Sequence, residues 1–312
     1  MKHATKIALR TAVLLLAAGM ILCAAALAHD GLRFSALSTA PAPVRQEQAI
    51  SAAGLNEIRI DAASDDVRVT RSDDADIHLS WYDREYLVYR LENEGGVLSL
   101  RLDRTQGRKD WKHWINFDLY GSGGVTLAVP ANFAGEVSAE TDSGGIGLSD
   151  VTLGGSLTCK TNSGPIKADA LAAAGATIRT VSGSVDGSDW FVAGPASCET
   201  DSGAATLKGV EAASFSLGAK SGRVKLAGVR SDAAAVRTGS GNITLDALSA
   251  DVITLSARSG DIRGTIDGAE TDYTVSADAV SGECSLRDRA GAGFRTLTVK
   301  TNSGDIDLSF LS

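Results

Sequence analysis

One short pattern, Ser-Gly, recurs through the C-terminal half of the chain at a nearly constant interval. Successive serines are 19 to 22 residues apart. The nine pairs are Ser143-Gly144, Ser163-Gly164, Ser182-Gly183, Ser202-Gly203, Ser221-Gly222, Ser240-Gly241, Ser259-Gly260, Ser281-Gly282 and Ser303-Gly304. A fixed period of this length is typical of solenoid proteins, in which each repeat forms one turn of a stack.

Apolar residues keep a constant position relative to each serine. Three residues after it lie Ile146, Ile166, Val185, Ala205, Val224, Ile243, Ile262, Cys284 and Ile306. Four residues before it, from Ala139 to Val299, the nine residues are also apolar. Polar residues alternate with them, which is the pattern of a half-buried strand. The sequence therefore predicts an all-β fold, a single-stranded parallel β-solenoid (β-helix) with about nine regular coils over residues 136–312.

The Ser-Gly pairs are predicted to be structural corners between an inbound and an outbound strand. Glycine would supply either a positive φ or a close backbone approach, and the serine hydroxyl would cap a neighbouring amide. Two residues before the serine only Thr or Ala occurs. All four histidines lie at or before residue 113, so no corner has a histidine nearby in the sequence to activate its serine.

The N-terminus differs from the rest of the chain. Lys2, Lys6 and Arg10 precede an uncharged run over residues 11–28. Its length favours an uncleaved membrane anchor, and the alternative is a signal peptide cleaved after Ala28. With positive charges on the N-terminal side, residues 29–312 are expected outside the cytoplasm, anchored to the membrane or secreted. We divide the chain into an anchor or signal (1–28), a linker (29–50), an N-terminal β section (51–135) and the regular repeats (136–312).

Charge narrows the choice of partners. The chain has a formal net charge of −8 at pH 7, and residues 1–28 contain three basic and no acidic side chains. The exported part is therefore more acidic still, so nucleic acid and anionic membrane surfaces would repel it. We expect no nucleic-acid partner.

Several segments together resemble a known family. They are the hydrophobic N-terminus, "LNEIRIDAASDDVRVTRSDDADIHLSW" (55–81), "GGVTLAVPANF" (123–133) and the serial Ser-Gly corners. In these features the chain is similar to the bacterial putative-adhesin family of unknown function. The resemblance implies a β-solenoid in the cell envelope, and it brings no catalytic residue with it.

Residues 51–135 are expected to cap and start the solenoid. They contain alternating apolar runs that are less regular than the later repeats. Half of the aromatic residues fall between Trp81 and Tyr120, including Trp111 and Trp114. A structural cap would cover the open sheet edge. The alternative is that Trp81, Trp111, Trp114 and Tyr120 form a ligand-facing aromatic lip.

The sequence indicates no cofactor. Cys23 lies in the hydrophobic run, while Cys159, Cys198 and Cys284 fit as small core residues, too far apart in the stack for a disulfide. Asp261, Glu283 and Asp305 follow the last three corner serines by two residues each. Stacking would place them in one outward row, where they would either form a weak cation site, for example for Ca²⁺, or remain solvated charges.

The last repeat predicts an open end. Its outbound strand carries Ile306, Leu308 and Phe310 in the inward register, and the chain ends at Ser312. Exposed sheet edges pair with other strands unless they are blocked. We therefore expect self-association or partner docking through the C-terminal coil, unless Phe310 and Leu311 fold over the core as a plug.

These observations favour a non-enzymatic envelope protein, an adhesin-like binding or interaction scaffold. Its partners would be a cell-wall polymer or an envelope protein. One alternative is a carbohydrate-active β-helix lyase or hydrolase, for which Asp65, Asp66, Asp73, Asp74 and Asp76 could supply carboxylates. Another is a structural or regulatory component of an envelope-stress system. An aromatic groove crossed by paired carboxylates would favour the enzyme.

Overall fold

The protein is all-β in the part of the chain that the structure describes. The computed structural model describes residues 42–84, 87–103, 123–131, 133–289 and 293–311. Of two compact units, one comprises residues 44–106 and 122–312 and contains every described strand, while the other comprises residues 1–43 and 107–121. The predicted anchor therefore lies outside the described residues. Within them, no helix has the length and apolar character needed to cross a membrane.

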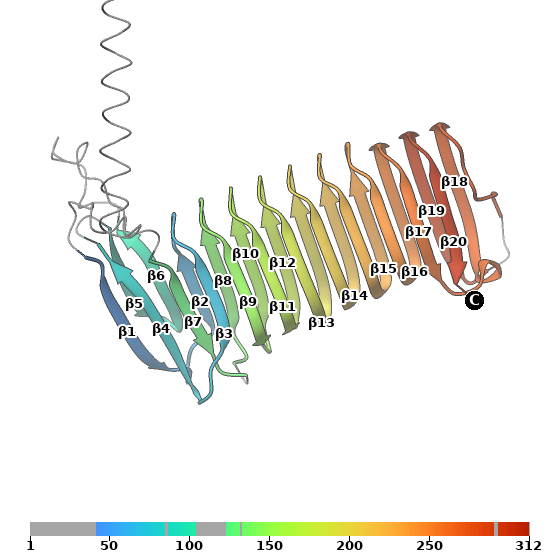
Figure 1. Cartoon of the computed structure of the whole chain (residues 1–312). Helices are drawn as coiled ribbons and strands as arrows, with labels where there is room; N and C mark the ends of the chain where they lie inside the picture. The colour runs from blue at the N-terminus through green and yellow to red at the C-terminus, as the bar shows by residue number, and fades with distance from the viewer. Residues whose placement is uncertain (1–41, 85–86, 104–122, 132, 290–292, 312) are drawn as a thin grey trace, which may run out of the picture. The chain divides into compact units, whose positions relative to one another are not determined.

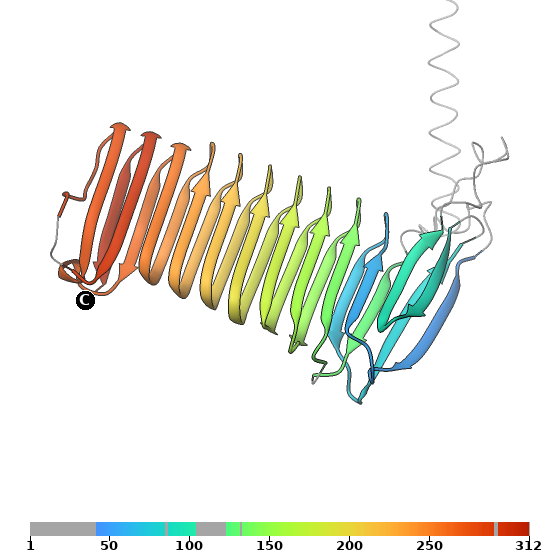
Figure 2. The same cartoon turned by 180° about the vertical axis from the view of Figure 1, so that it is seen from behind.

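The strands form a parallel β-solenoid, confirming the predicted fold class. Each turn has an inbound strand that ends at a Ser-Gly corner and an outbound strand that leaves it, and turns stack side by side (Figures 1 and 2). The regular strands are β8 (Glu136–Thr141), β9 (Ile146–Thr152), β10 (Ser156–Thr161), β11 (Ile166–Ala173), β12 (Gly175–Thr180), β13 (Val185–Thr200), β14 (Ala205–Ala219), β15 (Val224–Thr238), β16 (Ile243–Ser259) and β17 (Ile262–Asp267). From β13 to β16, one outbound strand continues into the next inbound strand.

Stacking in register places equivalent residues on top of one another. Ile166 pairs with Ile146 on one side and with Val185 on the other, and all three side chains are buried. The residues four before each corner serine stack in the same way, since Ile178 lies between Cys159 and Cys198. The core is therefore a set of continuous apolar rows, as the repeat predicts, and each row removes apolar surface from water along the whole stack.

The structure contains about eight regular turns, not nine. The eighth Ser-Gly pair, Ser281-Gly282, is not followed by an outbound strand among the described residues. Cys284 makes only an isolated bridge to Ile306, and its side chain is exposed. The prediction that Cys284 is a core residue is therefore wrong, because its turn does not complete a second strand to carry the residue inward.

The turns near the C-terminus do not stack in sequence order. The last strands are β18 (Tyr273–Ser281), β19 (Arg295–Ser303) and β20 (Ile306–Leu311), with a short 3-10 helix η3 (Glu270–Asp272) before β18. β19 lies between β16 and β18, and β20 pairs with β17 (Figure 1). The corner of Ser303 is therefore stacked between those of Ser259 and Ser281. β17 needs a full outbound strand as its neighbour, and only the Ser303 turn provides one.

This order changes which strands end the stack, and self-association or partner docking through the C-terminal coil stays a prediction. Ile306 and Leu308 are buried, and Phe310 is half-buried with its ring centroid 5.4 Å from that of Tyr273. The outermost strand on this side is β18, and part of its free edge is covered. Val275 exchanges two backbone hydrogen bonds with Arg289, and the Ala277 amide donates to Asp288 Oδ1.

A similar rearrangement occurs near the N-terminus. The strands there are β1 (Val44–Ser51), β2 (Glu57–Asp61), β3 (Val67–Arg71), β4 (Asp76–Asp83), β5 (Val88–Glu94), β6 (Val97–Asp103) and β7 (Val125–Val129). β2 lies between β6 and β8, and β3 between β7 and β9. Antiparallel strands end the stack on this side. β5 pairs with β6, β4 pairs with β7, and β1 pairs with β4. β1 occupies the end of the segment predicted as a linker, residues 29–50.

The corners explain why glycine recurs. A Cβ atom on Gly203 would lie 1.7 Å from the carbonyl oxygen of Gly183 in the adjacent turn, and Gly183 meets Gly164 in the same way at 1.8 Å. These two glycines do not have positive φ. Of the two reasons predicted for glycine, close backbone approach is therefore the one that applies at these corners.

Threonine, rather than serine, makes the hydrogen bonds of the corner. The buried Thr180 hydroxyl donates to the Gly164 carbonyl at 3.2 Å and accepts from the Gly183 amide at 2.9 Å. The same pair of bonds is made at Thr161, Thr200 and Thr238. All nine corner serines are exposed. Each threonine thus joins two turns by satisfying backbone groups that would otherwise be buried without partners.

Gly203→Ala tests the close approach at the corner. We expect it to lower the free energy of unfolding by about 1–3 kcal/mol, because the added methyl group overlaps backbone that cannot move independently. Gly147→Ala is the control, since nothing lies within 4 Å of its Cβ position. Urea unfolding followed by circular dichroism measures both. Equal midpoints for the two variants would contradict the interpretation.

The stacking order can be tested by pairs of cysteines in a Cys23→Ser, Cys284→Ser background. Neighbouring strands are about 4.8 Å apart, so Ser259→Cys with Ser303→Cys and Ser281→Cys with Ser303→Cys should each form a disulfide on mild oxidation. Ser259→Cys with Ser281→Cys should not, because two strand spacings exceed the reach of a disulfide. Mass spectrometry of digests gives the result. Oxidation of the third pair alone would show that the turns stack in sequence order.

Candidate functional site

Trp81, the one residue of the predicted aromatic lip among the described residues, does not face the solvent. Trp81 is only 5% exposed, and its Nε1 donates to Asp83 Oδ1 at 3.1 Å. Its ring therefore packs in the core and offers no face to a ligand. Trp111, Trp114 and Tyr120 lie outside the described residues.

The predicted row of carboxylates exists, in a different order. Along the stack the sequence is Asn242, Asp261, Asp305 and Glu283, and each side-chain oxygen of the first three accepts the backbone amide of the next residue at 3.0–3.1 Å. Arg263 also forms ion pairs with Asp261 and Asp305. Protein donors thus compensate these charges. No cluster of His, Cys, Asp or Glu suited to a metal ion occurs among the described residues, and the cation site stays a prediction.

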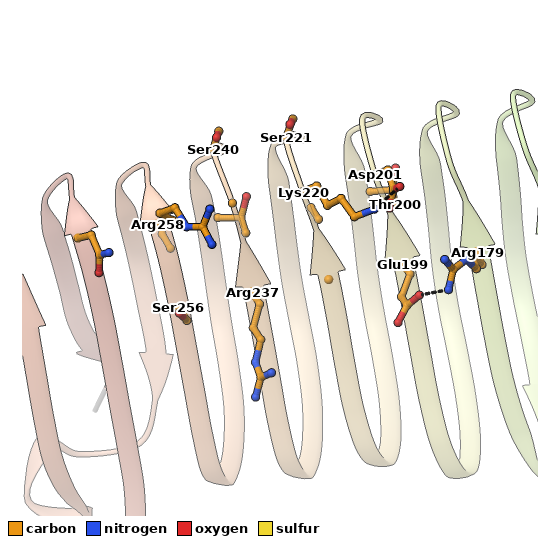
Figure 3. Close-up of a pocket in the computed structure, with 16 residues that line it drawn as sticks. Arg179, Glu199, Thr200, Asp201, Lys220, Ser221, Arg237, Ser240, Ser256 and Arg258 are labelled. Carbon is orange, nitrogen blue, oxygen red and sulfur yellow. Dashed lines mark hydrogen bonds and ion pairs between the residues drawn. The ribbon is translucent and has the colours of Figure 1, made fainter.

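A shallow groove of about 830 Å³ runs across the inbound strands beside the corners (Figure 3). Its charged lining residues are Arg179, Glu199, Asp201, Lys220, Arg237 and Arg258. Arg179, Glu199, Arg237 and Arg258 lie on β12, β13, β15 and β16, and Asp201 and Lys220 directly follow β13 and β14, so the groove crosses five consecutive strands. Small residues, including Gly218, Gly239 and Ala257, form the floor between them.

Two rows of outward residues cross this groove. One row contains Arg179, Glu199, Gly218, Arg237 and Ser256, which pair in succession across adjacent strands. The second lies two residues further along each strand and contains Asp201, Lys220, Gly239, Arg258 and Asn302. In each row an ion pair is followed by a glycine, an arginine and a neutral polar residue.

The glycines separate the arginines from the carboxylates. Arg179 pairs with Glu199 at 2.7 Å, and Lys220 pairs with Asp201. Arg237 has Gly218 and Ser256 as its neighbours in the row, so no carboxylate is opposite it. Among the described residues, neither Arg237 nor Arg258 is within ion-pair distance of a carboxylate. Both guanidinium groups therefore keep their donors for water or a ligand.

The groove lacks the features of a glycosidase site. Glu199 lies on β13 and Asp201 directly follows this strand, two residues further along the chain, and both line the groove. Each is paired with a basic side chain, whereas the general acid of such enzymes is a carboxyl kept protonated by its surroundings. No aromatic residue lines the groove. Of the other carboxylates considered for an enzyme, Asp74 contacts His78, and the pKa of this carboxyl is lowered mainly by that hydrogen bond.

A buried polar cluster lies near the first turn. Asp65 forms an ion pair with Arg84 at 2.8 Å and accepts a hydrogen bond from the Tyr89 hydroxyl at 2.8 Å. The same hydroxyl also lies 3.1 Å from the Ala62 carbonyl oxygen. Asp65 is 6% exposed and Tyr89 5%. With its groups paired to one another and closed to solvent, this cluster holds the first turn in place and offers no room for a substrate.

The two buried cysteines are inert packing groups. Cys159 and Cys198 are free thiols in the core, as predicted. Burial raises the pKa of each thiol to about 12. Reactive cysteines require the thiolate, which these residues do not form at neutral pH. Cys23 lies outside the described residues.

The fold and the site define a parallel β-solenoid that presents a polar, shallow groove rather than an enclosed cavity. The chain belongs to the Toastrack DUF4097 family, whose model matches residues 55–312. The family resemblance expected from the sequence is thereby confirmed.

Solved structures and curated proteins give further comparisons. A putative adhesin from Bacteroides fragilis is 14% identical, with 86% of this chain and 97% of that chain covered and a TM-score of 0.48. A putative lipid binding protein from Parabacteroides distasonis is 19% identical, with 86% and 95% covered and a TM-score of 0.40. A putative adhesin from the same organism is 14% identical, with 85% and 97% covered and a TM-score of 0.43. No curated protein matches the chain.

Tyr89→Phe tests the buried cluster through pH. Burial and the adjacent Asp65 carboxylate raise the pKa of the Tyr89 hydroxyl above its usual value. The Tyr89 hydroxyl therefore contributes fully to stability below about pH 10, the pKa of tyrosine in the unfolded chain. This contribution is lost as the pH rises above that value. The variant should be about 1–2 kcal/mol less stable at pH 7, through the lost hydrogen bond, and should lose less stability above pH 10.

Thermal unfolding between pH 7 and about pH 11 makes this measurement, since tyrosine titrates near pH 10. Tyr82→Phe is the control because it removes a hydroxyl outside the cluster. The pKa of Tyr273 is also raised, mainly by burial, so part of the alkaline loss should remain in every variant. An alkaline decline as steep in Tyr89→Phe as in the parent would contradict the assignment.

Proposed function

We propose that this protein is a non-enzymatic extracytoplasmic envelope protein that acts as an adhesin-like binding scaffold. The observation that carries the proposal is the groove over β12 to β16, where Arg237 and Arg258 are exposed without a carboxylate partner. A charged side chain held beside a shallow hollow is available to an incoming ligand. A rigid stack of in-register strands keeps such side chains at fixed spacings, as a binding surface requires.

The location follows from the N-terminal sequence. Residues 11–28 are apolar and follow three basic residues. In this proposal they hold the protein at the membrane, and the solenoid stands on the outer side. The partners within reach there are a cell-wall polymer or another envelope protein.

Capture from envelope fractions tests the proposal. The full chain in mild detergent, immobilised, should retain material from a cell-wall fraction or from solubilised envelope proteins. Replacing both groove arginines, Arg237→Gln with Arg258→Gln, should reduce the retained amount severalfold, because two charge-assisted contacts are lost. Capture of nothing from either fraction, or release of reducing sugars from the wall fraction, would contradict a non-enzymatic binding role.

A further inference from the structure

We infer that the groove over β12 to β16 binds an anionic glycopolymer, a chain of sugar or polyol units that carries carboxylate or phosphate groups. The inference rests on the proposed function and assigns its ligand class. It depends on three features of the groove, namely its local charge, the spacing of its arginines and the absence of aromatic and large apolar side chains from its lining.

The groove is basic within an acidic protein. Four basic side chains and two carboxylates line it, and the two carboxylates are taken up by Arg179 and Lys220. The chain as a whole carries a formal net charge of −8. An anion approaching the protein is therefore repelled over most of the surface and attracted here, so that the local charge selects both the ligand and its position.

The two unpaired arginines are placed for two anionic groups rather than one. Arg237 and Arg258 lie on adjacent strands and are offset by two residues along them, which separates their Cα atoms by roughly 8 Å. Figure 3 shows their side chains apart from one another on β15 and β16. Guanidinium groups bind carboxylate and phosphate in a bidentate manner. Successive charged units of one polymer can each occupy one of the two guanidinium groups.

The lining argues against other ligands. Neutral sugars and nucleic-acid bases bind by stacking on aromatic rings, and none lines the groove. A protein partner would need an apolar pocket for its central anchors, and the floor is made of glycine, alanine and serine. Dense polyanions such as nucleic acid would also be repelled by the acidic remainder of the chain. A flexible polymer of moderate charge density fits these conditions.

Binding of the full chain to defined polymers tests the inference. The probes are polygalacturonate, which carries carboxylates, poly(glycerol phosphate), which carries phosphodiesters, neutral dextran, and polyglutamate as an acidic peptide. Biolayer interferometry at about 50 mM and 500 mM salt measures the affinities. We expect one or both charged glycopolymers to bind at low salt, with binding lost at high salt through screening.

A matched pair of variants locates the site. Arg237→Gln with Arg258→Gln should weaken binding about tenfold, equivalent to about 1.4 kcal/mol. Arg223→Gln with Lys225→Gln is the control, because it removes the same charge from a neighbouring turn at exposed residues outside the groove. The control should bind like the parent. Melting temperatures of both variants should be unchanged, since all four residues are exposed.

The outcomes separate the alternatives. Preference for polygalacturonate or for poly(glycerol phosphate) identifies the anionic group and supports the inference. Equal weakening by both double variants, stronger binding of polyglutamate or equal binding of dextran would overturn it. Capture of envelope material without binding of any charged glycopolymer would overturn the ligand class while leaving the scaffold function in place. If the protein neither captures envelope material nor binds a charged glycopolymer, the proposed function is overturned as well.

Discussion

The architecture depends on the contact between glycines at the corner. From Gly164 onward, each corner glycine lies against the carbonyl oxygen of a glycine in an adjacent turn, and there is no space for a methyl group. This contact allows the backbones to approach at the spacing of hydrogen-bonded strands even where the chain turns. Threonines such as Thr180 then satisfy the backbone groups that the turn would leave unpaired. With the corner fixed, the apolar side chains on both strands can align in rows.

That regularity gives the surface its properties. Since equivalent residues stack, the outward residues form rows as well, and the identity of neighbours in a row decides whether a charge is paired. Glu199 follows Arg179 and forms an ion pair with it, whereas Gly218 and Ser256 leave Arg237 without one. The groove with its two unpaired arginines is therefore a consequence of substitutions at fixed positions of the repeat. No insertion or additional domain is needed to create it.

Much of the fold could be predicted from the sequence, because local and repeating signals determine it. The period of the Ser-Gly pairs and the apolar rows gave the parallel solenoid and the buried places of Cys159 and Cys198. The order of the terminal turns could not be predicted in this way. Consecutive elements usually pack next to one another, and only the missing strand after Ser281 indicates that the Ser303 turn must lie against β17. Cys284 was misplaced for the same reason.

The site was harder to predict than the fold. Trp81 is one of the four aromatic residues predicted for the ligand-facing lip, yet the alternation of β4 directs it into the core. Arg237 and Arg258 were not singled out, although the signal was present. Writing the repeats beneath one another shows that each arginine is preceded in its row by a glycine. The pairing of charges across strands becomes visible only when the register is known, and the hollow between them depends on side-chain packing.

The interleaved turns at the two ends have a consequence for how such a protein can change its length. In the first parallel turn of the sequence, β2 lies between β6 and β8 and β3 between β7 and β9; in the last turn, β19 lies between β16 and β18 and β20 pairs with β17. Both ends are thus closed by locally encoded units that are independent of the number of turns between them. Duplication or deletion of one repeat in the middle would move the ends apart or together by about 4.8 Å without disturbing either. The repeat region can therefore serve as an adjustable spacer in which reach and binding surface vary together, one turn at a time.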